Sequence, residues 1–374
     1  MTYQFVDSIS DYPLVKSIWT TLIDEGANHS FFLSWIWIGT WIKALSKENI
    51  SVTLVVIFKQ SRPIAAFFIG NSTFNRYWVI SGQSLTINTV NNAYYDKICL
   101  EFNSLLVAPD HNLNYEHLFD ALGKYYTWDE IYLPSIENSN YELISQSSNQ
   151  DNLFNIRTYH ISPSYYVDLE EIRSNNLNYL DLLSKNRKKQ IKSSINAYQK
   201  YGPITTKLAT TGEEALVMLR ELSKLHQERW GLKGELGAFS NIFLVHFHKT
   251  LIKNNFDKKC IQLLQVSCNG DPIGYLYHFT YFGKVYFYQS GFQYQKENKF
   301  RPGLVSHYLS IMLNAEQGYK YYDFLEGEAD YKKSMATGYS EMYWLKIQKK
   351  HLRFKLEQRL KNILNPVKKL IFAS

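Results

Sequence analysis

The sequence predicts an α/β (α+β) protein made of two tandem copies of one unit, each a mixed, mostly antiparallel sheet flanked by helices. Two observations carry this prediction. A β-rich stretch recurs in the second half of the chain, and the same order of helix and strand follows it both times. The length of 374 residues leaves room for two or three domains, each able to bury its own core.

The recurring stretches are VTLVVIFKQSRPIAAFFIGNSTFNRYWVISG and IQLLQVSCNGDPIGYLYHFTYFGKVYFYQSG. Each reads as a β-run, a turn with Pro-Ile, a second run, a short turn and a third run that closes in Ser-Gly. At one constant offset, the first copy's Pro63, Ile64, Ser81 and Gly82 match Pro272, Ile273, Ser290 and Gly291. This ungapped match indicates an internal duplication.

Helical segments come before each stretch, namely SFFLSWIWIGTWIKAL and LVMLRELSKLHQERW. A loop, a helix and one more strand come after each. The first copy has YEHLFDALGKYY and WDEIYLPSI, and the second has GLVSHYLSIMLNAEQGY and YYDFLEGEADYKKS. The polar segment 148–155 breaks both periods. We therefore expect domains at 1–155 and 156–348, followed by a basic tail at 349–374.

Composition and charge exclude several classes of protein. The three cysteines, Cys99, Cys260 and Cys268, do not have the spacing of a disulfide framework or a zinc site, so we expect no metal. The start of the chain lacks a signal-peptide pattern, and its longest apolar stretch is too short and polar to span a bilayer. We expect a cytoplasmic chain.

The net charge of +7 is concentrated in the tail. From residue 349 onward there are eight basic residues and one acid, so the body has 33 of each sign and does not favour nucleic-acid binding. The tail reads as a basic amphipathic helix, interrupted by Pro366, that either lies on the inner face of an anionic membrane or packs on the body. Its apolar stripe consists of Leu352, Leu356, Leu360, Ile363, Val367 and Leu370.

A meander followed by a helix that crosses to one further strand resembles the GNAT acyltransferase fold. Two copies resemble the Fem-type peptidoglycan transferases and the acetyltransferases of cellulose and exopolysaccharide synthesis, and the latter resemblance is the closer one over residues 160–345. It rests on the motifs PSYYVDL, SKNRKKQIKSSIN, LHQERWGLKGELGAF, RPGLVSHYL and YYDFLEGEADYKK. The first copy, which we expect to be degenerate, resembles the family only in outline.

The resemblance implies that RPGLVSHYL holds the pyrophosphate of coenzyme A at a helix N-terminus. Unpaired amides and the helix dipole favour an anion there, Gly303 lets the backbone approach, and Arg301 adds a charged contact. We expect donor contacts from Gln289, Ser290, Arg301, Gly303, Leu304 and Val305. A plain Pro-Gly turn is the alternative, and the motif departs from the family in having one glycine instead of two. The first copy has NLNYEHLF at this point and is expected to lack a donor site.

The acids after the last strand have two readings. Glu326 or Glu328 could act as the general base, since nearby acids raise the pKa of a carboxyl group. Alternatively, Glu328 and Asp330 could cap the helix DYKKSM. Tyr331 lies where GNAT enzymes often carry a Tyr that reprotonates the leaving thiolate, although its spacing to Gly338 and Tyr339 is unusual.

Two further motifs could contact substrate. Lys185, Arg187 and Lys188 open a lysine-rich helix, which is either a solvated face or a cradle for phosphates of a donor or acceptor. His226 is a candidate base, although lone histidines are more often structural. Trp230 could form a pocket wall or belong to the core.

The sequence thus predicts an N- or O-acyltransferase that moves an acyl group, expected to be acetyl, from acyl-CoA to an amino or hydroxyl group. A saccharide or cell-envelope precursor is the expected acceptor. Two alternatives stay open. One is a Fem-type transferase that uses aminoacyl-tRNA, and the other is a non-catalytic binding protein that docks on a membrane through its tail.

Overall fold

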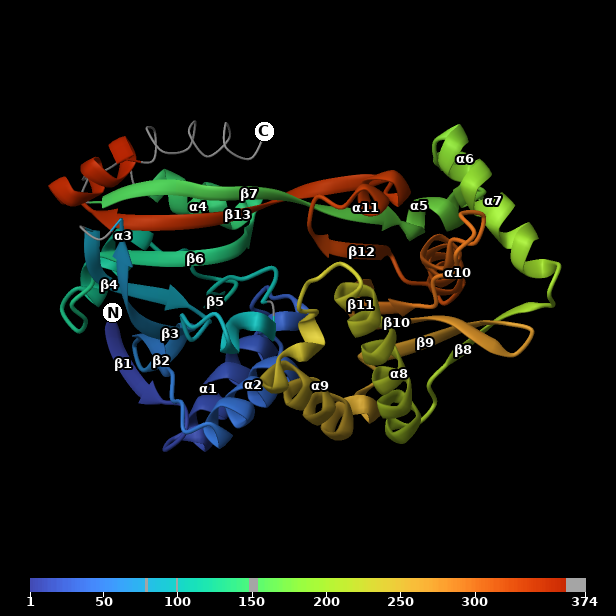
Figure 1. Cartoon of the computed structure of the whole chain (residues 1–374). Helices are drawn as coiled ribbons and strands as arrows, with labels where there is room; N and C mark the ends of the chain where they lie inside the picture. The colour runs from blue at the N-terminus through green and yellow to red at the C-terminus, as the bar shows by residue number, and fades with distance from the viewer. Residues whose placement is uncertain (78–79, 99, 148–153, 361–374) are drawn as a thin grey trace. The chain divides into compact units, whose positions relative to one another are not determined.

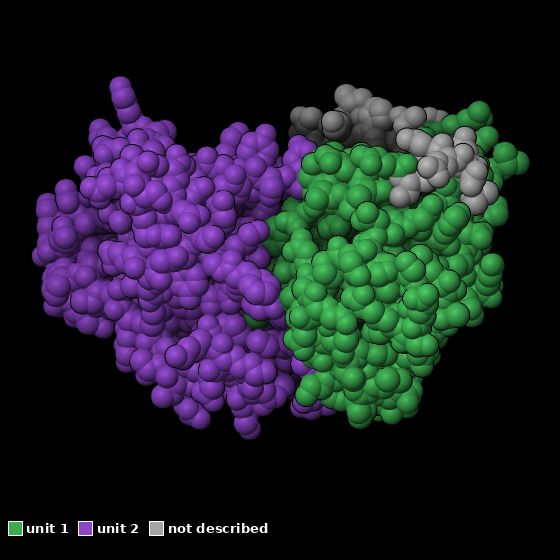
Figure 2. Space-filling model, turned by 180° about the vertical axis from the view of Figure 1, so that it is seen from behind, with its two compact units in different colours: residues 1–33, 49–161, 342–374 green, residues 34–48, 162–341 purple. Residues whose placement is uncertain are grey.

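The computed structural model describes residues 1–77, 80–98, 100–147 and 154–360 as a mixed α/β protein (Figure 1). The chain divides into two compact units that are not contiguous in sequence. Unit 1 comprises residues 1–33, 49–161 and 342–374, and unit 2 comprises residues 34–48 and 162–341 (Figure 2). Each unit is built around a mostly antiparallel sheet flanked by helices, so the predicted fold class is confirmed.

In unit 1 the strand order is β1-β2-β3-β4-β6-β13, with β5 paired to β3. Its elements are β1 (Thr2–Asp7), α1 (Tyr12–Asp24), η1 (Phe31–Leu33), β2 (Thr53–Lys59), β3 (Arg62–Arg76), β4 (Ile80–Ile87), η2 (Tyr95–Ile98), β5 (Leu106–Val107), α3 (Tyr115–Leu122), β6 (Glu130–Glu137) and α4 (Asn138–Ser147), with residues 342–349 of β13 (Gly338–Lys349) and the helical residues 352–360.

In unit 2 the strand order is β7-β12-β11-β10-β9-β8. Its elements are α2 (Trp35–Lys47), β7 (Phe154–Asp168) from residue 162, α5 (Leu169–Ser174), α6 (Tyr179–Leu182), α7 (Lys185–Gln199), β8 (Ile204–Leu208), α8 (Gly212–Gly231), η3 (Ala238–Ser240), α9 (Ile242–Asn255), η4 (Phe256–Lys258), β9 (Ile261–Cys268), β10 (Asp271–Tyr281), β11 (Lys284–Phe292), α10 (Pro302–Glu316), β12 (Tyr321–Glu326) and α11 (Asp330–Met335).

The two units share one pattern of strand pairing. Each has an antiparallel meander, β2-β3-β4 or β9-β10-β11, whose last strand pairs in parallel with the strand after the next long helix. The parallel ladder joins Ser84–Thr86 to Glu130–Tyr132 in unit 1 and Lys284–Tyr286 to Tyr321–Asp323 in unit 2. Parallel strands need a crossover connection, and α3 and α10 provide it. The structure therefore contains the predicted duplication.

One detail of the predicted repeat is wrong. Ser290 and Gly291 lie near the far end of β11, whereas Ser81 and Gly82 lie at the start of β4, next to its hairpin turn. The reason is that β3 continues to Arg76 and is longer than β10, which moves the hairpin turn along the chain. The matching Ser-Gly pairs are therefore not equivalent in structure.

The sheet of unit 2 is covered on both faces, as the alternation of side chains along β10 shows. Leu276 belongs to the core beneath α10, while the rings of Tyr277 and Phe279 contact His248 of α9 on the other face. α8 packs on β9, β10 and β11, and α2 packs on α9, where Trp37 contacts Phe247 edge to face. Because helices cover both faces of this sheet, a ligand could reach it at the ends of its strands.

The units exchange segments relative to the order of the sequence. α2 precedes the first meander but belongs to unit 2, and residues 342–360 follow the second copy but belong to unit 1. β7 and β13 each contribute residues to both units. The predicted domain boundaries at residues 155 and 348 refer to the two copies of the repeat and stay a prediction.

The described part of the tail is helical and packs on unit 1 through a face other than the predicted leucine stripe. Phe354 and Glu357 are buried, whereas Leu352 and Leu356 are 80% and 45% exposed. Arg76 bonds to Glu357 at 2.9 Å and also pairs with the buried Glu130. Residues 361–374, with Ile363, Pro366, Val367 and Leu370, lie outside the described residues.

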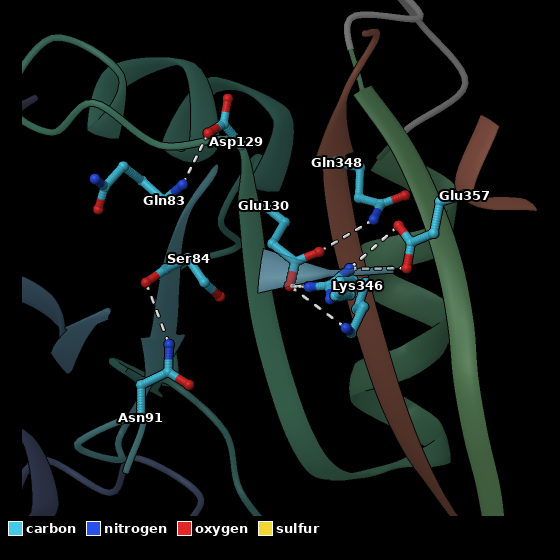
Figure 3. A network of polar contacts seen from close by, with 9 residues as sticks. Gln83, Ser84, Asn91, Asp129, Glu130, Lys346, Gln348 and Glu357 are labelled. Carbon is cyan, nitrogen blue, oxygen red and sulfur yellow. Dashed lines mark hydrogen bonds and ion pairs between the residues drawn. The ribbon is translucent and has the colours of Figure 1, made fainter. Parts of the chain in front are cut away.

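Figure 3 shows the polar network that holds this helix. Glu130 also accepts from Gln348 Nε2 at 3.1 Å and lies 3.4 Å from Lys346 Nζ. Asp129 accepts the Gln83 amide at 2.8 Å. It also pairs with Arg353 of the helix. Buried carboxylates are stable only when paired and hydrogen bonded, and these contacts meet that need.

No helix in the described residues is both long and apolar enough to cross a bilayer.

Candidate functional site

The candidate site lies where β11 and β12 diverge in unit 2. Their parallel ladder ends at Tyr286 and Asp323, although β11 continues to Phe292 and β12 to Glu326. The register of β12 against β7 shifts between Asp323 and Glu326, and Leu325 has a φ of +61°. A bulge of this kind bends the strand and redirects its side chains. The two strands therefore open at the end from which the Glu326 loop and α10 emerge.

The N-terminus of α10 lacks a side-chain cap. Arg301 occupies the N-cap position without a capping hydrogen bond, and Pro302, which has no amide hydrogen, begins the helix. The Val305 amide donates to the Arg301 carbonyl at 3.2 Å. The first-turn amides of Gly303 and Leu304 have no carbonyl partner within the helix. These amides, together with the helix dipole, favour an anion. Among the residues predicted to contact the acyl donor, Gly303 and Leu304 are therefore the ones that offer backbone amides.

Packing fixes the position of this helix end. The Arg301 amide donates to the buried Ser194 Oγ of α7 at 2.9 Å. A Cβ added at Gly303 would lie 3.2 Å from the Phe292 ring, so a larger residue would push the helix end away from β11. Gln289 and Ser290, the other predicted donor contacts, are half-buried on β11, before Phe292.

Arg187 belongs to this helix end and not to the lysine face of α7. α7 begins at Ser184, whose Oγ accepts the Arg187 amide at 3.2 Å, and Arg187 Nη1 donates to Gln190 at 2.8 Å. Burial lowers the pKa of Arg187, the positive charge of Arg301 lowers it further, and the negative charge of Asp330 raises it. Two mutually repelling guanidinium groups beside uncapped amides are an arrangement that favours a strong anion.

Lys185 and Lys188, which the sequence grouped with Arg187, face the other way. With a rotation of about 100° per residue, they share an outer face of α7 with Lys189 and Lys192. These side chains line a separate open hollow. The structure thus divides the predicted phosphate cradle into two basic regions.

The predicted acids lie beyond the bulge of β12. Glu326 is half-buried opposite Ser164 of β7, while Glu328 and Asp330 are exposed. Ala329 is the N-cap of α11 and no side chain caps it, so capping by Glu328 or Asp330 is not observed. Asp330 does lie in the first turn, where its charge suits the dipole.

Asp323 is a functional candidate that the sequence reasoning passed over. Its carboxylate is 5% exposed, accepts the Leu325 amide at 2.8 Å and accepts the Ser164 hydroxyl at 3.0 Å. Burial raises its pKa to about 6. The carboxylate thus holds the bulge that positions Glu326. Lys332 Nζ donates to the carbonyl oxygens of Leu325, at 3.2 Å, and of Glu326.

The strand pattern of YYDFLE contained a signal for this role. An acid between Tyr322 and Phe324, both fully buried, lies inside a strand and needs internal partners.

Tyr331 packs beside the same opening. Its ring stacks on His307 at 5.3 Å with an interplanar angle of 23°, and burial raises its pKa. His307 in turn shares the hydroxyl of Tyr322 with His278, at 3.2 and 3.0 Å. This buried network fixes the base of α10 against β12 and orients the Tyr331 ring.

His226 is a packed residue of α8. Its ring lies 5.1 Å from Phe239, edge to face, and 5.9 Å from the half-buried Trp230. Its Nδ1 is 3.2 Å from Gln227 Oε1, and burial lowers its pKa. These contacts are those of a structural histidine beside a loop.

No cluster of His, Cys, Asp and Glu suited to a metal ion occurs in the described ranges.

Comparisons with known proteins agree with this arrangement. Residues 185–333, which run from α7 to α11, match the family model described as the acetyltransferase (GNAT) domain. Unit 1 repeats the same meander, crossover helix and parallel strand. The protein has a tandem GNAT-like fold. The duplication and the fold predicted from the sequence are therefore confirmed.

Solved structures show the same fold at low sequence identity. FemX aligns with a TM-score of 0.56 and 9% identity, covering 92% of this chain and 97% of that chain. L-PGS from Bacillus licheniformis aligns with a TM-score of 0.53 and 12% identity, covering 96% of this chain and 97% of that chain. No curated protein matches the chain by sequence. Fem-type relatives in fold are thus confirmed, whereas the relation to cellulose synthesis stays a prediction.

Proposed function

We propose that the GNAT-like fold acts as an N- or O-acyltransferase with acyl-CoA, expected to be acetyl-CoA, as the donor. The observation that carries this proposal is the convergence of Arg187, Arg301 and the uncapped start of α10 beside the opening of β11 and β12. In this arrangement the diphosphate of the donor lies against the Gly303 and Leu304 amides and the two guanidinium groups. The strand opening then receives the arm that carries the acyl group.

The proposed reaction is a direct transfer. The acceptor nitrogen or oxygen bonds to the acyl carbon, the carbon–sulfur bond breaks, and the acceptor loses one proton. Glu326 takes that proton, and Tyr331 supplies one to the departing sulfur. Asp323 and Lys332 hold the bulge that places Glu326, so they are positioning residues.

The acceptor in this proposal is a saccharide or a cell-envelope precursor. The exposed Leu352 and Leu356, flanked by basic residues, support peripheral contact with an anionic membrane, where such precursors are found. A Fem-type transfer from aminoacyl-tRNA is a second candidate, because FemX shares the fold.

The donor assignment is tested by calorimetry with acetyl-CoA and the double variant Arg301→Ala, Gly303→Leu. Loss of one good charged hydrogen bond costs roughly 1.5–3 kcal/mol, so affinity should fall at least about tenfold. The matched control is Asn114→Ala in unit 1, at the start of the equivalent helix α3. Asn114 Oδ1 accepts the His117 amide at 3.0 Å, so its loss should cost about 1 kcal/mol of stability and spare acetyl-CoA binding.

Unchanged affinity in a folded double variant would exclude this helix end as the phosphate site. A large loss of binding in the Asn114 variant would place the donor in unit 1 instead.

A further inference from the structure

The outer face of α7 forms a basic surface that the proposed reaction does not use. Together with the loop before α10, it lines an open hollow of about 720 Å³. The lining residues are Lys185, Lys188, Lys189, Lys192, Ser193, Asn196, Ala197, Lys200 and Lys299. They include six lysines and no acid.

Most of this charge is not neutralised within the protein. Lys188 pairs with Asp181, and Lys299 pairs with Glu297 at 2.6 Å. In the described part of the chain, no carboxylate forms an ion pair with the remaining four, which are Lys185, Lys189, Lys192 and Lys200. Like charges three or four residues apart on a helix repel and destabilise it. An anionic ligand would relieve that repulsion.

The extent of the hollow indicates a chain of anions and not a single one. At a rise of about 1.5 Å per residue, Lys185 and Lys200 lie roughly 22 Å apart along the helix axis. A row of cations of this length matches a repeating phosphate backbone, which carries one charge at every nucleotide. Because Arg187 lies on the opposite side of α7, this row is separate from the proposed donor site.

An aromatic ring stands at one end of the row. Tyr201 follows Lys200, is 63% exposed, and packs edge-on against Phe300 at 5.8 Å, directly after Lys299. An exposed ring beside a basic groove is the combination with which proteins bind single strands, since any base can stack on it. A concave surface with polar lysine walls also suits a strand better than a flat lipid layer.

We propose that the lysine hollow of α7 binds single-stranded nucleic acid, with its phosphates on the lysines and one base on Tyr201. This goes beyond the proposed acyl-CoA reaction, which needs no second polyanion. The even charge balance of the body does not oppose it, because the contact requires only this local surface.

The test measures binding of a fluorescently labelled single-stranded RNA of about 12 nucleotides to the full chain at several salt concentrations. For single strands, the logarithm of affinity falls with the logarithm of salt with a slope of roughly −0.7 for each phosphate contact. The triple variant Lys185→Gln, Lys189→Gln, Lys192→Gln should therefore bind more weakly and reduce the slope by about 2. The matched control removes the same charge from exposed positions of α9 and η4, with the changes Lys249→Gln, Lys253→Gln and Lys258→Gln. This control should bind RNA as the native chain does.

Tyr201→Ala should lower affinity roughly 5- to 150-fold, the equivalent of about 1–3 kcal/mol for one stacked base, and leave the salt slope unchanged. Tyr201→Phe should restore binding. Equal losses in the two triple variants, or no binding of RNA at low salt, would overturn the proposal. Binding of phosphatidylglycerol vesicles that depends on the hollow, in the absence of RNA binding, would also overturn it and identify a lipid surface.

Acetyl-CoA calorimetry on the same variants separates this inference from the donor proposal. We expect unchanged acetyl-CoA affinity in the α7 triple variant. If that variant loses acetyl-CoA binding but keeps RNA binding, the hollow belongs to the donor site and the inference fails, while the acyltransferase proposal stands.

Discussion

The two units open their sheets at the same place, and among the described residues a segment fills the opening in unit 1 but not in unit 2. Beyond the ladder of β4 and β6, Asn103 forms a parallel bridge with Ile136, and its amide donates to the Ser135 carbonyl at 2.8 Å. Its Nδ2 also donates to the Ile87 carbonyl at 3.1 Å, which links the segment to β4. In unit 2 the ladder of β11 and β12 ends at Tyr286 and Asp323, and the bulge of β12 follows.

The length of one connection accounts for this difference. Residues 88–114 join β4 to α3, whereas only residues 293–301 join β11 to α10. The longer connection has enough chain to return to the sheet as β5 and Asn103, and Asn88 holds it there through bonds of 2.8 Å to Asn103 and Ser104. A longer connection can thus fill the opening beyond the parallel ladder in one copy of a duplicated fold.

The helix ends differ in the same direction. Asn114 caps α3 with its own side chain, while α10 begins at Arg301 with none. The cap satisfies one first-turn amide, that of His117, which an anion would otherwise need. Unit 1 is therefore filled at the sheet and capped at the helix, a difference that supports our proposal of a donor site in unit 2.

The largest expected effect is on the turnover rate of a variant at Glu326 in unit 2. Glu326→Gln keeps size and hydrogen bonding but cannot accept a proton at neutral pH, so turnover should fall by roughly 10²–10⁴-fold with acetyl-CoA affinity almost unchanged. Steady-state rates with an amine or saccharide acceptor would measure it. Glu137→Gln, at the end of β6 in unit 1, and the exposed Glu328→Gln are controls that should retain the rate. A full-rate Glu326→Gln enzyme would remove Glu326 from the mechanism.

The second prediction concerns Asp323, whose place in unit 1 is taken by Tyr132. Burial raises the pKa of Asp323 from 3.8 to about 6, so the folded chain keeps a proton that the unfolded chain releases over this interval. This contribution to stability is complete below pH 3.8 and is lost as the pH rises through 6. The free energy of unfolding of Asp323→Asn, relative to the native chain, should therefore rise by up to about 3 kcal/mol from pH 4 to pH 7.

Denaturant unfolding at a series of pH values would measure this difference. Ser164→Ala serves as the control, because it removes a hydrogen bond to Asp323 but keeps the titrating group. A pH-independent difference between Asp323→Asn and the native chain would show that Asp323 keeps an ordinary pKa.

The smallest expected effect is that of a variant designed to reopen the sheet of unit 1 between β4 and β6. Asn103→Ala removes the bonds to Asn88 and Ile87 and should destabilise the chain by about 1–3 kcal/mol, because buried partners lose their hydrogen bonds. It should not create a second donor site, since α3 stays capped by Asn114. Acetyl-CoA calorimetry should still give one site per chain. A second site in this variant would show that the Asn103 segment alone closes unit 1.

The sequence by itself determined the duplication, the meanders, the strand that ends in acids, and the Arg-Pro-Gly start of a helix. These features depend on residues close together in the chain, where period and turn chemistry govern structure. The shared face of Lys185, Lys188, Lys189 and Lys192 also follows from helical spacing alone.

Tertiary structure decided the rest. Three of these features depend on residues far apart in sequence: the repulsion between Arg187 and Arg301, the hydrogen bond from Ser164 to the buried Asp323, and the bond from Asn103 to Ile87. The length of β3, which separates the two Ser-Gly pairs, depends on its pairing with β4, and the transfer of α2 to unit 2 depends on packing against α9. Local spacing carries no record of such contacts, because their energy comes from surfaces that meet only after the chain has folded.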